Sequence, residues 1–357
     1  MTSFALVLET NNLTGGGADA ARTALSLERL LARLREQTRP VSTLHELVIT
    51  HDGLPSGARA RLDAIAGTEI RWVDISSRDA TVDRRGDGNA PSPIDYYEAK
   101  NRGFDVTSAD VVAFADADCW PEPAWLDELL APFSDEAIQV VAGRTTYRTD
   151  VLGTAASTID FMYFDSPLGD GCTRNFYANN VAFRRDVFGA RRYATHDMYR
   201  GHCQVLGTRL HRDGIKVTFV PAARTIHRFP DRLSELITLR LLRGEDTIEI
   251  APHLVRTYLP AAAPLGNLGP VVPLAILAAR FGFSLRSINR QDMPPAHGMR
   301  WLRVAGVIAG ISLVDAAGTV ARSLGWRPGS RNDSAVKVTL SYHRDADQLD
   351  PRHQVAA

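Results

Sequence analysis

Two carboxylates one residue apart end an apolar run, in which Asp110-Val-Val-Ala-Phe-Ala115 continues into Asp116-Ala117-Asp118. Such a pair, released from a strand into a loop, can address one hard cation and leave coordination sites for diphosphate oxygens. A divalent ion held in this way neutralises charge that develops on a diphosphate leaving group. Solvated acids at a strand end show the same pattern, so the pair needs support from its surroundings.

The elements around the pair follow a regular alternation. Short apolar runs predict strands at Phe4–Leu8, His45–Thr50, Glu69–Ile75 and Asp110–Ala115, and amphipathic segments between them predict helices. This alternation predicts an α/β fold of Rossmann-like type, a mostly parallel sheet with helices on both faces. Further along, Ala124 to Phe133 reads as a helix, and residues 149–180, rich in Asp, Gly, Asn and aromatic residues, read as loops.

Polar residues follow three of these strands directly. They are Glu9 to Asn12, Asp52, and the pair Asp116 and Asp118. Because ligands of open parallel sheets bind beyond the carboxyl ends of the strands, we expect these side chains to converge on one rim.

Composition excludes several classes of protein. The chain has 357 residues and 41 basic against 41 acidic residues, so a strongly basic nucleic-acid binder is not expected. Its three cysteines, at positions 119, 172 and 203, are widely spaced and contain no C-x-x-C, which argues against a disulfide framework or a structural zinc site. The first ten residues lack the pattern of a secretory signal, and we expect a reducing, cytoplasmic location.

Several motifs follow one another along the chain in an order that indicates a family. The segment Ala99-Lys100-Asn101-Arg102-Gly103 precedes the strand and Asp116-Ala-Asp118, and Asn179-Asn180-Val-Ala-Phe-Arg184-Arg185 and Pro221-Ala-Ala-Arg-Thr-Ile-His227 follow. Over roughly Ser3 to Asp246 the chain resembles the inverting family-2 glycosyltransferases of the GT-A fold. The resemblance implies transfer of a sugar from a nucleotide-diphosphate donor, most readily UDP, to an acceptor hydroxyl, with Mn2+ or Mg2+ as cofactor.

The resemblance also implies roles for individual residues. Asp118, Asp116 and His227 would bind the metal, and Asn179, Asn180 and Arg184 would lie on the acceptor side. The donor-side residues would be Thr10, Asn11, Asp52, Lys100, Asn101, Asp116 and Arg243. Arg240 and Arg243 share one face of a predicted helix, which suits either a diphosphate site or a solvated surface.

The chain departs from the family where the catalytic base is expected. In place of a Gly-Glu-Asp segment it has Gly201-His202-Cys203. Since imidazole titrates near neutral pH, His202 is the first candidate for the base, with Asp197 and Asp165 as alternatives. A catalytically silent relative that binds nucleotide sugars stays open as the second function. Glu245-Asp246 reads as a solvated acidic pair.

The segment after residue 250 has its own character. Tyr258 to Ala279 carries no charge but four prolines, and Val304 to Ala321 carries only Asp315. Basic flanks favour peripheral contact with the inner leaflet of the cell membrane, and a core or homo-oligomer interface is the alternative. We therefore expect a catalytic domain over 1–250, an apolar helical extension over 251–330 and a polar tail over 331–357. The acceptor stays open among saccharides, lipid-linked compounds and small molecules.

Overall fold

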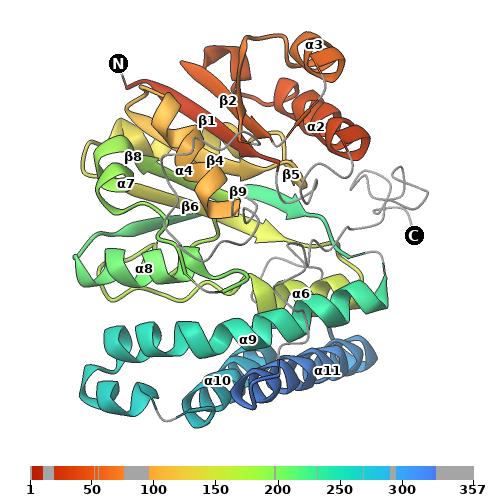
Figure 1. Cartoon of the computed structure of the whole chain (residues 1–357), viewed down its shortest axis with the longest axis vertical. Coiled ribbons are helices and arrows are strands. Elements are labelled where there is room, and N and C mark those ends of the chain that lie inside the picture. Colours follow the sequence, from red (N-terminus) through yellow and green to blue (C-terminus); the bar gives the residue numbers. More distant parts are fainter. Residues whose placement is uncertain are drawn as a thin grey trace, which may run out of the picture.

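A mixed sheet forms the centre of the protein in the computed structural model (Figure 1). The structure describes residues 2–10, 20–51, 53–54, 56–75, 96–196, 198–230, 232–267, 269–289 and 295–326. In this part of the chain nine strands have the order β3-β2-β1-β4-β8-β6-β9-β5, with β7 beside β9. The strands are β1 (Phe4–Glu9), β2 (Glu46–His51), β3 (Ile70–Asp74), β4 (Val111–Asp116), β5 (Cys119–Pro121), β6 (Val140–Thr146), β7 (Cys172–Thr173), β8 (Asn180–Arg184) and β9 (Val217–His227).

The first four strands of this order run parallel, and β8 runs antiparallel between β4 and β6. Helices cover both faces, so the predicted GT-A-type α/β sheet is confirmed. All six residues of β4 are buried, because a strand covered on both faces has no polar side. The helices are α2 (Ala20–Arg35), α3 (Ser56–Ala66), α4 (Tyr96–Val106), α5 (Trp125–Leu130), α6 (Val151–Asp160), α7 (Arg185–Arg191), α8 (His202–Arg212), α9 (Leu233–Tyr258), α10 (Val271–Ser287) and α11 (Gly298–Ser323). Short 3-10 helices span η1 (Val41–Thr43), η2 (Ala131–Ser134) and η3 (Pro260–Asn267).

Alternate residues of β1 show how the two faces are built. Leu6 and Leu8 pack in one core with side chains from α2, α3 and α5. Val7, between them in sequence, packs in a second core with side chains from α4, α7 and α8. Successive side chains of a strand point to opposite faces, so one short run supplies both cores.

The expectation of loops over 149–180 is wrong for its first third. Residues 151–160 form α6, which begins after Asp150, whose Oδ1 accepts a hydrogen bond from the backbone N–H of Gly153 at 2.7 Å. This cap satisfies a free N–H of the first turn, and eight of the ten residues are buried. Phe176, further along the same segment, is fully buried in the core.

The segment after β9 forms a helical layer below the sheet in Figure 1. The prolines after Tyr258 separate α9 from α10 through η3, as their positions predict. Helix α11 packs closely on α9, since a Cβ built on Gly244 would lie 2.0 Å from the backbone oxygen of Asp315. Thr319 Oγ1 donates to Gly244 O at 2.7 Å across the same interface.

A buried ion cluster joins α6, α9, α10 and α11. It consists of Asp160, Arg240, Arg243, Arg280 and Asp315. Arg240 pairs with Asp160 and with both carboxylate oxygens of Asp315, and its side chain is 2% exposed. Of the two alternatives for Arg240, the solvated surface is therefore wrong, because two buried acids on neighbouring helices take up its charge.

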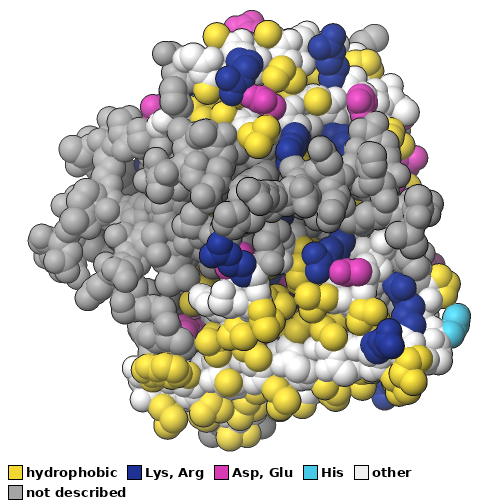
Figure 2. Space-filling model, turned by 90° about the vertical axis from the view of Figure 1, so that its right-hand side faces the viewer, with side chains coloured by type: hydrophobic (Ala, Val, Ile, Leu, Met, Phe, Trp, Pro, Cys, Tyr) yellow, Lys and Arg dark blue, Asp and Glu magenta, His cyan; other side chains and the backbone are white. Residues whose placement is uncertain are grey.

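The helical layer exposes a second, apolar face. Among the described residues, α11 is the helix that is long and apolar enough to cross a membrane. Less than half of its apolar stretch is buried inside the protein. Hydrophobic side chains gather over the lower part of the molecule in Figure 2, where the helical layer lies. Large exposed side chains on this layer include Leu259, Val271, Met299, Leu302, Leu313, Val320, Leu324 and Trp326.

Candidate active site

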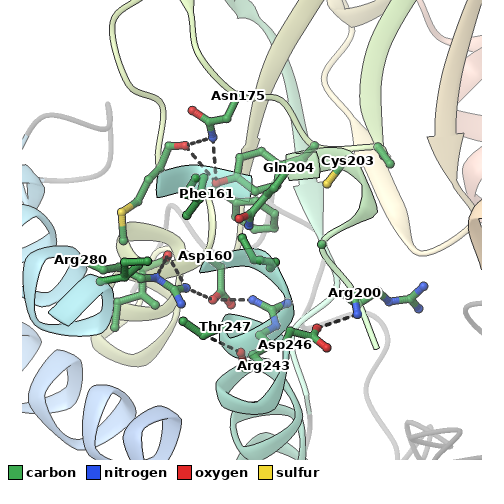
Figure 3. A pocket seen from close by; sticks show the side chains of 18 of the residues that line it. Asp160, Phe161, Asn175, Arg200, Cys203, Gln204, Arg243, Asp246, Thr247 and Arg280 are labelled. Atoms are coloured by element: carbon green, nitrogen blue, oxygen red, sulfur yellow. Dashed lines mark hydrogen bonds and ion pairs between the residues drawn. The ribbon is translucent and has the colours of Figure 1, made fainter. Parts of the chain in front are cut away.

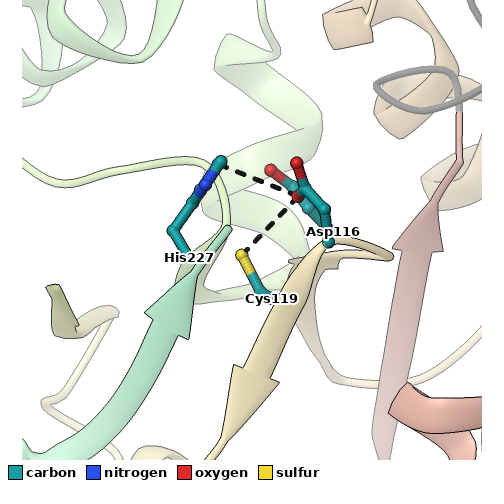
Figure 4. Close-up of side chains that lie close together, drawn as sticks. Asp116, Cys119 and His227 are labelled. Carbon is teal, nitrogen blue, oxygen red and sulfur yellow. Dashed lines mark hydrogen bonds and ion pairs between the residues drawn. The ribbon is translucent and has the colours of Figure 1, made fainter. Parts of the chain in front are cut away.

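Four side chains that could hold a metal ion meet at the end of β4. One ligand atom from each of Asp116, Asp118, Cys119 and His227 lies within 4.8 Å of the others. Figure 4 shows Asp116, Cys119 and His227 directed toward one another. His227 Nε2 lies 3.7 Å from Asp118 Oδ1. The two carboxylates are ligands that suit Mn2+ or Mg2+, so they agree with the expected cofactor.

Strand pairing explains why residues more than a hundred positions apart meet. The chain turns at Ala117 and Asp118, and the short strand β5 pairs antiparallel with the end of β9. In this register Cys119 lies opposite His227, and Arg228 N donates to Asp118 O at 2.9 Å. A backbone ladder thus holds the imidazole beside the carboxylates.

Asp116 has strong protein partners on its other side. Lys100 Nζ lies 2.6 Å from Asp116 Oδ1 and also donates to Ala115 O at 3.0 Å. The hydroxyl of Tyr96 is 2.8 and 2.9 Å from the two carboxylate oxygens. The Lys100 side chain is fully buried, so its charge fixes Asp116. Asp118 is fully buried too, and burial, with Asp116 nearby, raises its pKa.

A cavity of about 860 Å³ opens beside this group. Its walls come from the end of the sheet, from the segment before α8, and from α9 and α10. Five of the residues predicted for the site line it, and these are Asp116, Asp118, Asn179, His227 and Arg243. Arg243 forms an ion pair with Asp160 across the cavity wall (Figure 3).

Other predicted residues have structural contacts away from the cavity. Asn180 bonds through its amide to Arg144 O, Ala223 O and Trp125 Nε1, which ties β8 to its neighbours. Arg184 donates to backbone oxygens around η2, at 2.8 Å to Ile138 O. Asn101 bonds to Tyr193, and Thr10 Oγ1 donates to Thr50 O at 2.7 Å. Asn11, Asp52, Asp197 and the tail over 331–357 lie outside the described residues.

The two described candidates for the base lie off the cavity wall. The ring of His202 is buried and stacks on Tyr97 with a centroid distance of 4.3 Å. Burial, together with His196 and Arg200, lowers the pKa of His202 to about 3. Asp165 is exposed and pairs through its backbone with Thr173. A base must reach the proton that it removes, so the placement of both side chains argues against this role.

Asp246 is a cavity residue that the sequence interpretation missed. Its side chain is 4% exposed rather than solvated, and it lines the cavity. Its two carboxylate oxygens accept the backbone N–H groups of Tyr199 at 2.6 Å and Arg200 at 2.7 Å (Figure 3). Burial raises the pKa of Asp246 well above its usual value of 3.8. Leu239 lies seven residues before Asp246, and Ile250 and Leu254 lie four and eight residues after it. This helical spacing of apolar residues was the available signal that this face is buried.

Glu9, at the end of β1, is a second buried acid near the site. Its Cα lies opposite that of Asp116 in the parallel register of β1 and β4. The side chain is fully buried, and within the described part of the chain neither carboxylate oxygen has a hydrogen-bond partner. Burial and then Asp116 raise the pKa of Glu9 well above its usual value of 4.5.

The sheet topology, with an acidic pair at the end of β4, is that of the GT-A fold. Residues 22–195 match the model of glycosyl transferase family 2, which confirms the family expected from the motifs. This region therefore belongs to that family.

Individual relatives agree with this assignment. The glycosyltransferase AglE of Haloferax volcanii is 27% identical over 169 residues, which are 46% of this chain and 50% of the relative. The match thus spans about half the length of that relative. The mannosyltransferase PcManGT from Pyrobaculum calidifontis, solved in complex with GDP-Man and Mn2+, has a similar fold. Its TM-score is 0.53 at 15% identity, over 90% of this chain and 87% of that chain.

Proposed function

We propose that this protein is a metal-dependent transferase that moves a sugar from a nucleoside-diphosphate donor to an acceptor hydroxyl with inversion. The observation that carries the proposal is the meeting of Asp116, Asp118 and His227 beside a cavity of about 860 Å³. In one step the acceptor oxygen bonds to the anomeric carbon, the bond from that carbon to the diphosphate breaks, and the acceptor proton passes to a base.

We assign the donor end of the cavity to the metal group. Asp118 and His227 would hold Mn2+ or Mg2+, which would neutralise charge on the leaving diphosphate. Asp116, fixed by Lys100 and Tyr96, would face the donor from a rigid position. UDP is the first nucleotide to test, because the family resemblance implies it.

We assign the role of base to Asp246 instead of His202. Asp246 is the acid that α9 brings to the cavity wall, and a raised pKa suits proton transfer near neutral pH. Each of its oxygens accepts one backbone N–H, which leaves a further lone pair on each for the acceptor hydroxyl. Asp246 on α9 would thus take the place of the acidic motif that the chain lacks before α8.

We further propose that the helical layer rests on a membrane surface. The exposed apolar side chains of α11 support this location, as do Arg300, Arg303 and Arg322 near its two ends. A homo-oligomer through the same layer is the alternative. Binding of the purified chain to vesicles with anionic lipid, against its sedimentation behaviour in their absence, distinguishes the two.

A screen of UDP- and GDP-sugars by thermal shift, with and without Mn2+, tests the donor proposal. A true donor raises the melting temperature by mass action, and only when Mn2+ is present. Release of the nucleoside diphosphate from the stabilising donor then tests turnover. Binding without any turnover across acceptors would favour the silent relative, and absence of nucleotide binding would refute both functions.

A further inference from the structure

The cavity changes character along its length. Beside the sheet it is polar, with Asp116, Asp118 and His227. On the side of the helical layer its wall is apolar, with Ile250, Leu254 and Val255 from α9 and Ile276, Leu277 and Phe283 from α10. The sugar and diphosphate of a donor are polar throughout, so the apolar wall suits the acceptor rather than this part of the donor.

Arginines also line the cavity. Arg243 and Arg280 line the cavity and belong to the buried ion cluster. This cluster holds three arginines against two aspartates, so among its own members one positive charge is in excess. Arg174 and Arg286 add further guanidinium groups to the wall, and Arg174 lies 5.1 Å from the ring of Tyr258. Guanidinium groups bind phosphate oxygens with paired hydrogen bonds, so this stretch suits a phosphate.

We propose that the acceptor is an amphiphile in which phosphate joins an apolar chain to the group with the accepting hydroxyl. The chain lies along the wall of α9 and α10, the phosphate meets the arginines, and the hydroxyl reaches the metal group. This inference rests on the proposed function, because it assigns the acceptor half of the same cavity. It also agrees with the apolar surface of the same helical layer, where a substrate with a long chain would enter from a lipid phase (Figure 2).

One glycine offers a sharp test of the apolar wall. Gly282 lines the cavity inside α10, and a Cβ built on it meets nothing within 4 Å. The backbone therefore leaves room for a Cβ at this position, so Gly282→Leu adds a bulky side chain at the cavity wall, and leucine favours a helix more than glycine does. Gly306→Leu is the matched control, because Gly306 lies inside α11, has the same open space and does not line the cavity.

The experiment measures binding of geranyl phosphate, geraniol and inorganic phosphate to the full chain by calorimetry. We expect geranyl phosphate to bind at least tenfold more tightly than either partial probe. Gly282→Leu should weaken this binding at least tenfold, and Gly306→Leu should leave it unchanged. Equal binding of inorganic and geranyl phosphate would overturn the proposal in favour of a small anionic acceptor. Undiminished binding to Gly282→Leu would overturn it in favour of adsorption to the exposed apolar face.

Binding of UDP and GDP with Mn2+ to the same three proteins separates the two proposals. Nucleotide binding should be the same in all of them, since Gly282 belongs to the α10 wall. If the unaltered chain binds neither UDP nor GDP, this result counts against the proposed function, whether or not the chain binds geranyl phosphate.

Discussion

Replacement of Asp118 by asparagine tests the metal site, because it should change the melting temperature in opposite directions without and with a bound metal ion. The carboxylate is fully buried, and burial raises its pKa, so its charge costs stability while no cation is bound. Asparagine keeps the shape and removes the charge. Without metal, we therefore expect Asp118→Asn to melt at a higher temperature than the unaltered chain.

With Mn2+ and UDP the order should reverse. At a concentration 100 times the dissociation constant, a ligand stabilises the folded chain by about 2.7 kcal/mol. For a protein of this size that corresponds to a rise in melting temperature of ~4 °C. Asp118→Asn loses a ligand from a group whose donor atoms lie within 4.8 Å of one another, so most of this rise should disappear.

Differential scanning fluorimetry with Mn2+ and with a chelator measures both effects. Asp165→Asn is the control, because Asp165 is an exposed acid outside the cavity wall and should respond to Mn2+ like the unaltered chain. An Asp118→Asn protein that Mn2+ and UDP stabilise as strongly as the unaltered chain would refute the metal assignment.

Three further predictions concern other buried charges. Asp246→Asn should lower turnover at least 100-fold with little change in donor affinity, whereas His202→Ala should lower turnover far less. A larger loss of turnover in His202→Ala than in Asp246→Asn would identify His202 as the base. Arg240→Leu removes a charge partner from the two aspartates of the ion cluster, and urea denaturation should show a loss of stability of about 3–5 kcal/mol. The partly exposed ion pair of Arg39 is the control, and Arg39→Leu should cost less than ~1 kcal/mol. The raised pKa of Glu9 means that the folded chain holds a proton that the unfolded chain releases above about pH 4.5, so stability is lost as pH rises from there. Glu9→Gln removes this loss, and its advantage in urea should be larger at pH 8 than at pH 5; an equal difference at both pH values would contradict the reasoning.

Local sequence patterns were sufficient for the parallel half of the sheet. The apolar runs of β1, β2 and β4 were located to within one or two residues, because a strand covered on both faces reads as a continuous apolar run. Helix α6 was missed because its residues include Gly153, two threonines and a serine, which favour loops locally. Burial against the C-terminal helices and the cap at Asp150 outweigh that preference.

The sequence by itself determined that acids end the strands, that their neighbours match a transferase family, and that the stretch over 251–330 is largely apolar. These are properties of residue type and short spacing. Only the tertiary structure decided which charges are buried, because that depends on distant segments. The pairing of β5 with β9 brings His227 to Asp118, and the crossing of α9 and α11 brings Arg240 to Asp315. For the same reason Asp246, which sequence alone places on a solvated helix, lies in the cavity wall beside the segment that leads into α8.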